Sequence, residues 1–433
     1  MKLYPHQEEA LKLIEDKNRC AVYYDMGLGK TYIGSEKMVT LGANINLVIC
    51  QKSKIQDWVN HFKDNYEWID DVLDITNKKT FELFTGLLKT KAYPPKYMCV
   101  GVINYDLVWR RKELLKLHDF TLMLDESSLI TNRTANRSGF ILKLNPSNVI
   151  LLSGTPTAGK YEKLWSQLQL LGWNIDEDTY FKSYVDYKWV ERDSGYFDKE
   201  ILGYKNVDHL KKRLAKFGAI FKKTEEVIDL PKQVDQMIYV EQSDYYKKFC
   251  KDKYVIVDDQ ELIGDTSLVR LLYKRQLCGQ YCQDKIKAFQ DLVESTEDRL
   301  VVFYNFNEEL NKMWKLTDTI NKPVSVVNGK IKQLNHYDMY DNSVTFVQYQ
   351  AGAYGLNLQK ANKIIYFSLP LGVGSCDLWE QSKKRIHRIG QENTCFYYYL
   401  IVENSVETWN LDLLKTGKEL TDELFKTEEE HVR

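Results

Sequence analysis

The chain has 433 residues, of which 44% are hydrophobic and 28% charged, so it is long enough for two or three domains with buried cores. The formal net charge is −1, which means that any site for a polyanion must be a local patch. No apolar run approaches the length of a membrane span, and the amino-terminal segment lacks the apolar core of a signal peptide. With eight irregularly spaced cysteines, these features predict a cytoplasmic protein with reduced thiols and no membrane association.

Short apolar runs rich in β-forming residues occupy the first part of the chain, and each is followed by an amphipathic stretch. Runs of this kind are typical of parallel strands that are buried on both faces in βαβ units. The runs are Cys20–Tyr24, Asn46–Cys50, Met98–Ile103, Thr121–Leu124 and Val149–Leu152. They predict an α/β lobe with a parallel sheet.

The segment Asp25-Met-Gly-Leu-Gly-Lys-Thr follows the first of these runs and precedes a helical pattern. Its glycines let backbone N–H groups close around phosphate oxygens, and the N-terminus of the helix favours an anion. Lys30 would neutralise the β- and γ-phosphates, and the Thr31 hydroxyl would ligate Mg²⁺. The strict phosphate-loop pattern has glycine where Tyr24 stands, so the match is incomplete. The predicted loop residues are Gly27, Leu28, Gly29, Lys30 and Thr31.

Two carboxylates, Asp125 and Glu126, end the run that begins at Thr121. In open α/β sheets, ligands bind at the carboxyl ends of the strands. An aspartate there can hold Mg²⁺ through water, and the adjacent glutamate can orient or deprotonate the attacking water. Such a pair alone is more often a solvated loop, but a phosphate loop in the same lobe favours the catalytic interpretation.

The passage from Thr157 to Ile286 has a different character, because it is mostly helical in pattern and rich in Tyr and Lys. It contains one proline, Pro231, and we place the lobe boundary beside it. The first lobe is therefore predicted over residues 1–228, with a helical insertion at about 157–228. The second lobe is predicted over residues 229–433, with a helical start at about 240–290.

The second half repeats the pattern of apolar runs and predicts a second parallel-sheet lobe. The runs are Leu300–Tyr304, Val324–Val327, Val344–Val347, Lys363–Phe367 and Cys395–Val402.

A basic segment, Gln381–Gln391, lies between the last two of these runs. Arg385 and Arg388 are three residues apart, so on a helix they would share one face. From there they could reach a γ-phosphate across a cleft between the lobes and stabilise the charge of the transition state, an effect of roughly 10³–10⁵ in rate. Such a run by itself is more often a solvated basic face. His387 has no visible ligand partner, and we interpret it as structural.

In chain order these segments resemble the motifs of the Swi2/Snf2-type ATPases of helicase superfamily 2, and the resemblance covers nearly the full length. The Arg-Ile-Gly-Gln ending of the last motif is the feature most particular to Snf2 relatives. In the first lobe the matching segments are Leu3–Gln7, Asp25–Thr31, Ile49–Ser53 with Trp58, Val102–Tyr105, Asp125–Ser128 and Leu152–Pro156. In the second lobe they are Val301–Tyr304, Gln350–Leu358 and Arg385–Gln391.

The resemblance implies two RecA-like parallel-sheet lobes in tandem with a helical Snf2-type insertion, and ATP with Mg²⁺ as ligands. It makes Gln7 the residue that reads the adenine and Gly355 a further nucleotide-binding residue. Thr31 and Asp125 would hold the Mg²⁺. The implied catalytic residues are Lys30, Asp125, Glu126, Arg385 and Arg388.

Two departures from the family pattern stand out. Ser127 and Ser128 follow the acidic pair where the family commonly has Ala or Glu and then His, which leaves open how this motif is linked to Leu152–Pro156. Lys222 and Lys223 replace paired arginines in the passage between the lobes, and lysine cannot make the same bidentate contacts.

The implied activity is that of an ATP-driven motor on DNA, with duplex expected in preference to a single strand. The predicted contacts to nucleic acid are Lys52, Lys54, Tyr105, Asn305 and Gln350. Strand separation or annealing is the nearest alternative. A nucleotide-driven switch that binds a protein partner, and a phosphotransferase that uses only the phosphate loop, stay open. By analogy, we expect a compact bacterial or bacteriophage enzyme that works with replication or recombination proteins.

Overall fold

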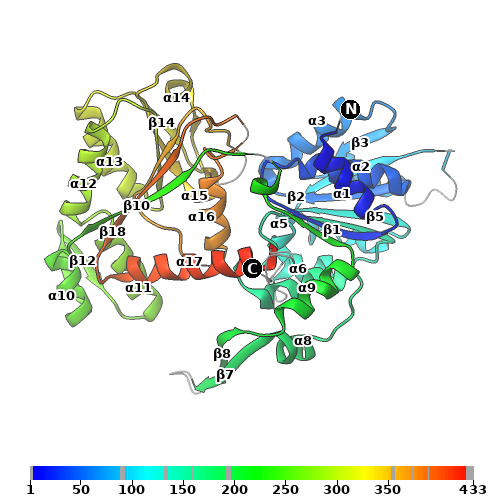
Figure 1. The fold of residues 1–433 in the computed structure, drawn as a ribbon, viewed down its shortest axis with the longest axis horizontal. Coiled ribbons are helices and arrows are strands. Elements are labelled where there is room, and N and C mark those ends of the chain that lie inside the picture. Colours follow the sequence, from blue (N-terminus) through cyan, green and yellow to red (C-terminus); the bar gives the residue numbers. More distant parts are fainter. Residues whose placement is uncertain are drawn as a thin grey trace. The chain divides into compact units, whose positions relative to one another are not determined.

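The computed structural model describes residues 3–87, 93–94, 96–130, 135–157, 159–191, 197–227, 229–352, 356–372, 374–388 and 390–425. The chain divides into two compact units. Unit 1 comprises Met1–Val227 and Glu419–Arg433, and unit 2 comprises Ile228–Lys418. Each unit contains its own seven-stranded sheet (Figure 1). No helix of the described residues is long and apolar enough to cross a membrane.

The sheet of unit 1 has the order β3-β4-β2-β5-β6-β1-β9, and every pair in it is parallel. Its central strands are buried almost throughout because helices cover them, which explains their continuous apolar sequence. The strands are β1 Arg19–Tyr24, β2 Ile45–Cys50, β3 Asp71–Asp74, β4 Cys99–Asn104, β5 Phe120–Asp125, β6 Asn148–Leu152 and β9 Ala219–Lys222.

Helix α1 precedes the first strand of unit 1, and the other α-helices of residues 1–227 lie between its strands along the chain. They are α1 Pro5–Leu13, α2 Lys30–Leu41, α3 Ile55–Asn65, α4 Lys78–Leu87, α5 Tyr105–Val108, α6 Asn136–Ile141, α7 Trp165–Leu170, α8 Glu177–Tyr184 and α9 Val207–Lys216. Strand β6 lies between β1 and β5 in the sheet. The segments that follow these three strands are therefore neighbours at one edge of the sheet, and this edge is where ligands bind in open α/β folds.

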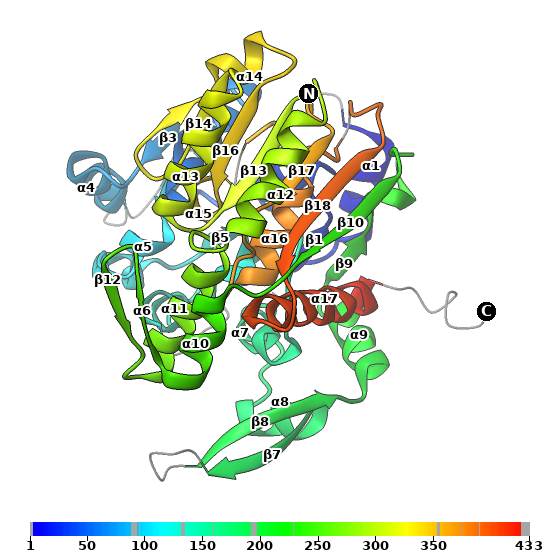
Figure 2. The same cartoon turned by 90° about the vertical axis from the view of Figure 1, so that its left-hand side faces the viewer.

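The expected helical insertion at about 157–228 is only partly helical. An antiparallel hairpin, β7 Val185–Glu191 with β8 Phe197–Tyr204, projects from unit 1 beside α8 and α9 (Figure 2). Strand β9 also comes from this passage and pairs with β1 in the sheet. The alternation of apolar and charged residues in the hairpin matches the two-residue period of a partly exposed strand, which is why this part is not helical.

The sheet of unit 2 has the order β10-β18-β17-β13-β16-β14-β15. All its pairs are parallel except β14 with β15. The strands are β10 Gln233–Val240, β13 Leu300–Tyr304, β14 Val324–Val327, β15 Lys332–Gln333, β16 Val344–Gln348, β17 Lys363–Tyr366 and β18 Cys395–Val402. The prediction of an α/β protein with two parallel-sheet lobes in tandem is confirmed, and all ten predicted strands are present.

Helices cover both faces of this second sheet. Helices α12 Gln283–Glu294 and α13 Asn307–Thr319 lie on one face of the sheet (Figure 2), where they pack with Val302. Val301 on the other face packs with α16 Ser375–Lys383 and α17 Val406–Phe425. The short helices are α14 Asn335–Met339 and α15 Tyr349–Gly352. The start of unit 2 is not purely helical, since a hairpin, β11 Tyr254–Val257 with β12 Gln260–Ile263, separates α10 Asp244–Asp252 from α11 Ser267–Cys278.

Candidate nucleotide site

The predicted phosphate loop connects β1 to α2, as the sequence pattern requires. Gly27 and Gly29 have φ values of 88° and 70°, a left-handed conformation that side chains with a Cβ rarely adopt. Gly29 is the residue before the first turn of α2, and a Cβ there would lie 2.1 Å from Gln7 Nε2. The backbone conformation therefore favours glycine at this position, and any larger residue would also displace the amide of Gln7.

The ammonium group of Lys30 is folded over the loop. Its Nζ donates to the carbonyl oxygens of Tyr24 at 2.7 Å and Asp25 at 3.2 Å. Thr31, in the first turn of α2, is partly exposed. An anion in the loop would compete with the two carbonyls for the Lys30 donors, and it would also meet the N-terminus of α2. The residues present therefore fit a phosphate group.

Helix α1 is attached to the loop through Gln7, which is 3% exposed. Its Oε1 accepts from the Tyr4 backbone N–H at 2.9 Å, and its Nε2 lies 3.5 Å from the Leu28 carbonyl. His6 Nε2 lies 3.0 Å from the same carbonyl. Because these contacts join α1 directly to the phosphate loop, the position of Gln7 is compatible with the predicted contact to the base.

The acidic pair lies at the end of β5. Asp125 Oδ2 accepts a hydrogen bond from Trp58 Nε1 at 2.8 Å, and Glu126 has a left-handed φ of 57°. Burial raises the pKa of the Asp125 carboxyl, whereas the Trp58 hydrogen bond and the charge of Lys30 oppose the rise. Left-handed backbone at a residue other than glycine costs free energy and is concentrated at functional sites.

A residue that the sequence did not single out connects three parts of this site. Gln167 of α7 is fully buried, and its Oε1 accepts from the hydroxyls of Ser127 at 2.8 Å and Tyr23 at 2.9 Å. Its Nε2 donates to the Pro156 carbonyl at 2.7 Å. One amide thus joins the segment after β5, the segment after β6 and the strand that leads to the phosphate loop. The signal that could have revealed it is a glutamine on the apolar side of an amphipathic stretch.

The hydrogen bonds of Gln167 also show how the acidic motif, with Ser127 and Ser128, is linked to the segment Leu152–Pro156. The segment Leu152–Pro156 lies beside the loop, since a Cβ on Gly154 would be 3.5 Å from Lys30 Nζ. Its link to the acidic motif runs from Pro156 through Gln167 to Ser127.

The two arginines of the basic segment do not share a helical face, so that premise of the prediction was wrong. Helix α16 ends at Lys383, and the chain then turns, with the Arg385 carbonyl accepting from the Leu358 N–H at 3.1 Å. Arg385 is 4% exposed, and its guanidinium donates to the carbonyls of Gln381 and Leu356. These hydrogen bonds provide donors for two backbone carbonyls of unit 2, which favours a structural role for Arg385.

Arg388 differs from Arg385, because it is only partly buried. Partial burial lowers its pKa, but a guanidinium remains charged in proteins. Within the part of the chain that the structure describes, no acceptor engages the Arg388 guanidinium. His387 between them contacts the Pro231 carbonyl at 2.8 Å, a structural position. Gly355, which was predicted to contact the nucleotide, lies outside the described residues.

The predicted nucleic-acid contacts are scattered and differ in exposure. Tyr105 is 2% exposed and donates its hydroxyl to the Asp125 carbonyl at 2.9 Å, so the prediction for this residue is abandoned. The Asn305 amide donates to Ser368 Oγ and the Leu369 carbonyl, which makes it a positioning group within unit 2. Lys52 and Gln350 are exposed, while Lys54 is half-buried and forms an ion pair with Asp57 at 2.8 Å.

The sequence matches two described protein families. Residues 6–286 match the family described as SNF2-related domain, and residues 284–390 match the helicase conserved C-terminal domain. Together the two matches include the phosphate loop, the acidic pair and both arginines.

Relatives of known name match over most of the chain. The chain is 24% identical to the mouse "SWI/SNF-related matrix-associated actin-dependent regulator of chromatin subfamily A member 1", over 88% of this chain and 39% of the mouse protein. It is also 24% identical to the "Uncharacterized ATP-dependent helicase YqhH" of Bacillus subtilis, over 99% of this chain and 82% of that protein. The chain thus spans about two fifths of the mouse relative.

A solved structure described as "Sulfolobus solfataricus SWI2/SNF2 ATPase core in complex with dsDNA" shares 18% identity with the chain. The similarity covers 97% of this chain and 92% of the Sulfolobus chain, with a TM-score of 0.45. Because the SNF2-related domain accounts for well over half of the sequence, this chain belongs to the SNF2-related family.

Proposed function

We propose that the chain hydrolyses ATP and uses the free energy to move along double-stranded DNA. The observation that carries the proposal is the meeting of three segments at neighbouring strand ends in unit 1. These segments are the phosphate loop after β1, the acidic pair at the end of β5, and the segment Leu152–Pro156 after β6. In a SNF2-related chain, these are the parts that an ATPase needs in its first lobe.

The residues of unit 1 have distinct tasks in the proposed reaction. Lys30 releases the carbonyls of Tyr24 and Asp25 and binds phosphate oxygens. Thr31 and Asp125 would hold Mg²⁺, which neutralises charge on the phosphates when it is bound. Glu126 orients the attacking water and takes its proton.

Unit 2 completes the site in this proposal. Arg388, rather than Arg385, supplies the guanidinium that stabilises the charge on the transferred phosphoryl group. The reason is that the Arg385 guanidinium donates to two carbonyls, whereas no described residue accepts a hydrogen bond from the Arg388 guanidinium. ATP then favours the arrangement in which both units contact it, by its higher affinity for that state, and hydrolysis removes the preference. Exposed Lys52 and Gln350, with Lys54, are the proposed contacts to DNA phosphates.

The test is the rate of ATP hydrolysis by the full chain without DNA and with duplex, single-stranded and forked DNA. We expect strong stimulation by duplex, and displacement of a third strand from a triplex as the sign of movement. Equal rates under all four conditions would overturn the proposal in favour of a nucleotide switch. Stimulation restricted to forked or single-stranded DNA would favour strand separation or annealing instead; a relative that is 22% identical over 100% of this chain is named "DNA annealing helicase and endonuclease ZRANB3".

Trp58→Phe should move the acid limb of the pH–activity profile to higher pH. The ring still packs against Phe62, but the hydrogen bond that stabilises the ionised Asp125 is lost. Its loss raises the pKa of Asp125 further, so the ionised form, which is the active one, disappears at a higher pH as the solution is acidified. The concentration of Mg²⁺ for half-maximal activity should also rise. An acid limb at the same pH as in the wild type would show that the indole N–H has no electrostatic role.

Gln167→Leu should lower kcat for ATP hydrolysis by roughly ten- to a hundredfold and change KM for ATP little. The substitution keeps the volume but leaves buried hydroxyls and the Pro156 carbonyl without their partner. Gln169→Leu is the matched control, because Gln169 is on the same helix and, among the described residues, donates only to the carbonyls of Trp173 and Ile175. Equal losses of kcat in the two variants would mean that Gln167 merely stabilises the fold of α7.

A further inference from the structure

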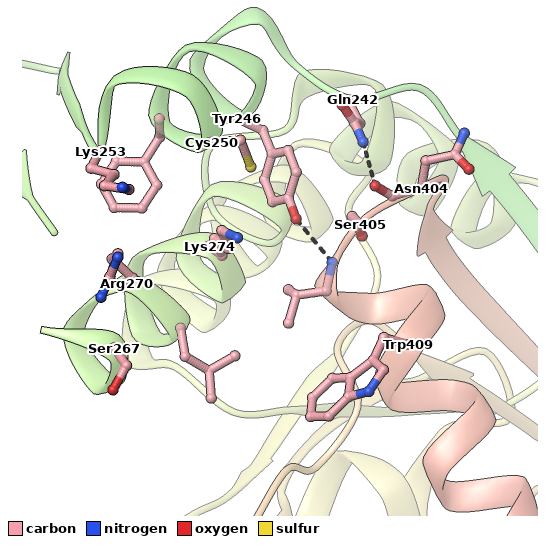
Figure 3. Close-up of a pocket in the computed structure, with 13 residues that line it drawn as sticks. Gln242, Tyr246, Cys250, Lys253, Ser267, Arg270, Lys274, Asn404, Ser405 and Trp409 are labelled. Atoms are coloured by element: carbon pink, nitrogen blue, oxygen red, sulfur yellow. Dashed lines mark hydrogen bonds between the residues drawn. The ribbon is translucent and has the colours of Figure 1, made fainter. Parts of the chain in front are cut away.

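Unit 2 contains a cavity that the proposed motor does not use. It has a volume of about 720 Å³ and lies between α10, α11 and the start of α17 (Figure 3). A cavity of this size accommodates a small molecule or a single nucleotide. None of the predicted site residues lines it. The lining residues are Gln242, Tyr246, Phe249, Cys250, Lys253, Ser267, Arg270, Leu271, Lys274, Asn404, Ser405, Val406 and Trp409.

The charge of this cavity is entirely positive. Lys253, Arg270 and Lys274 line it, and none of the lining residues is acidic. Arg270 and Lys274 are four residues apart on α11, where like charges repel across one helical turn. None of the three forms an ion pair with any residue that the structure describes. Arg270 and Lys274 are moreover partly buried, so an anion in the cavity would stabilise them.

The Arg270 side chain is held in place before any ligand arrives. Its Nε donates to the Thr266 carbonyl at 3.2 Å, and its stem packs so closely that a Cβ on Gly264 would lie 2.5 Å from Arg270 Cγ. The two terminal nitrogens make no hydrogen bond within the described chain. A fixed guanidinium with two free nitrogens is suited to a phosphate or carboxylate.

The other wall of the cavity is aromatic and apolar. Trp409 of α17 is 53% exposed, and Figure 3 shows its ring across the cavity from Arg270. This wall is held to α10, since the Val406 N–H donates to the Tyr246 hydroxyl at 2.9 Å. Gln242 fixes the loop before α17 by donating to the Asn404 carbonyl at 2.6 Å. The cavity therefore combines one firmly placed guanidinium and two lysines with an exposed flat ring.

We propose that this cavity binds a single strand of DNA, with one unpaired base stacked on Trp409 and the flanking phosphates on Arg270, Lys274 and Lys253. Cations that follow the backbone and an aromatic ring that stacks on a base are the two components of single-strand sites. A paired base in a duplex is not available for such stacking. Lys248 and Lys251 are also exposed on α10, but they do not line the cavity, so the choice of a nucleic acid over an acidic peptide depends on the stacking ring beside the cations.

The test is binding of a fluorescein-labelled oligothymidylate of about twelve nucleotides to the full chain without ATP or Mg²⁺, followed by anisotropy. Arg270→Gln with Lys274→Gln should weaken binding at least tenfold. The slope of log affinity against log salt should fall by about 1.4, since each phosphate on a single strand contributes about 0.7. Trp409→Ala should weaken binding roughly tenfold, and Trp409→Phe should retain most of it.

The matched control is Lys287→Gln with Lys315→Gln, which removes the same charge from exposed positions of α12 and α13. It should leave binding within about twofold of the wild type, and melting temperatures verify that all variants are folded. Equal weakening by the control, or no weakening by the cavity variants, would overturn the proposal. A labelled peptide rich in Glu and Trp that binds more tightly than the oligonucleotide, with the same dependence on Arg270 and Lys274, would replace DNA by an acidic protein partner. Duplex-stimulated hydrolysis by the wild type is a separate measurement, so failure of the motor would not affect this result.

Discussion

Lys30→Ala is expected to abolish ATP hydrolysis and to weaken ATP binding by at least about a hundredfold. The ammonium group donates to two carbonyls of the loop, at 2.7 and 3.2 Å. These acceptors are neutral, whereas a triphosphate carries several negative charges, so the ammonium group transfers to the phosphates when ATP enters. Alanine removes the only cation that the sequence places within the loop itself. Binding of a fluorescent ATP analogue and release of phosphate measure the two effects.

The matched variant for this experiment is Glu126→Gln, which keeps the size and hydrogen-bonding capacity of the side chain but cannot accept the proton of the attacking water. It should bind ATP as the wild type does and hydrolyse it roughly 10²–10⁴-fold more slowly. Lys30→Ala and Glu126→Gln would then separate binding from catalysis. If Glu126→Gln also lost ATP binding, Glu126, whose backbone is left-handed at φ 57°, would support the structure of the loop. Its side chain would then not be the catalytic base. If Lys30→Ala retained turnover, the segment would not be a phosphate loop.

The parts of the site that could be predicted are those whose residues are contiguous. Gly27, Gly29 and Lys30 fall within one short segment between a strand and a helix, so local spacing was enough to predict a glycine loop between β1 and α2. The ten buried strands were predicted for a similar reason, because each one carries its own apolar pattern. The amphipathic strands of the hairpins and the edge strand β10 have weaker patterns, and these were missed.

The parts that could not be predicted depend on contacts between residues far apart in the chain. Trp58 donates to Asp125 and Gln167 joins Tyr23 to Pro156, and no spacing rule relates these positions. Tyr105 was misjudged for the same reason, since its hydroxyl is used inside the fold by the backbone of Asp125. Sequence motifs thus identified which segments meet, while the hydrogen bonds that hold them together required the structure.

In the basic segment Gln381–Gln391, too, the sequence did not predict the contacts of the side chains, and these contacts change which arginine is proposed to be catalytic. Spacing alone treated Arg385 and Arg388 as equivalent. The turn after α16 buries Arg385 against the carbonyls of Gln381 and Leu356 and leaves Arg388 partly exposed. Their substitution should therefore have different consequences.

Arg388→Ala is expected to lower kcat for ATP hydrolysis by about 10³–10⁵-fold, with a much smaller effect on ATP binding. A guanidinium that stabilises developing charge contributes mainly in the transition state, so its removal lowers kcat rather than the affinity for the ground state. Arg388→Lys keeps the charge but not the planar fork, and it should restore little of the rate. The melting temperature should remain close to that of the wild type, because no described residue depends on this guanidinium.

Arg385→Ala provides the contrast. Truncation leaves the buried carbonyls of Gln381 and Leu356 without a donor, so it should lower the free energy of unfolding by about 2–4 kcal/mol, and activity should fall only as far as the folded fraction does. The opposite pattern, with a stable but inactive Arg385→Ala variant, would exchange the roles of the two arginines. Hydrolysis that survived Arg388→Ala and Arg385→Ala alike would mean that unit 1 acts without unit 2. The phosphotransferase alternative would then account for the phosphate loop better than a motor does, because a motor requires that the nucleotide be sensed by both units.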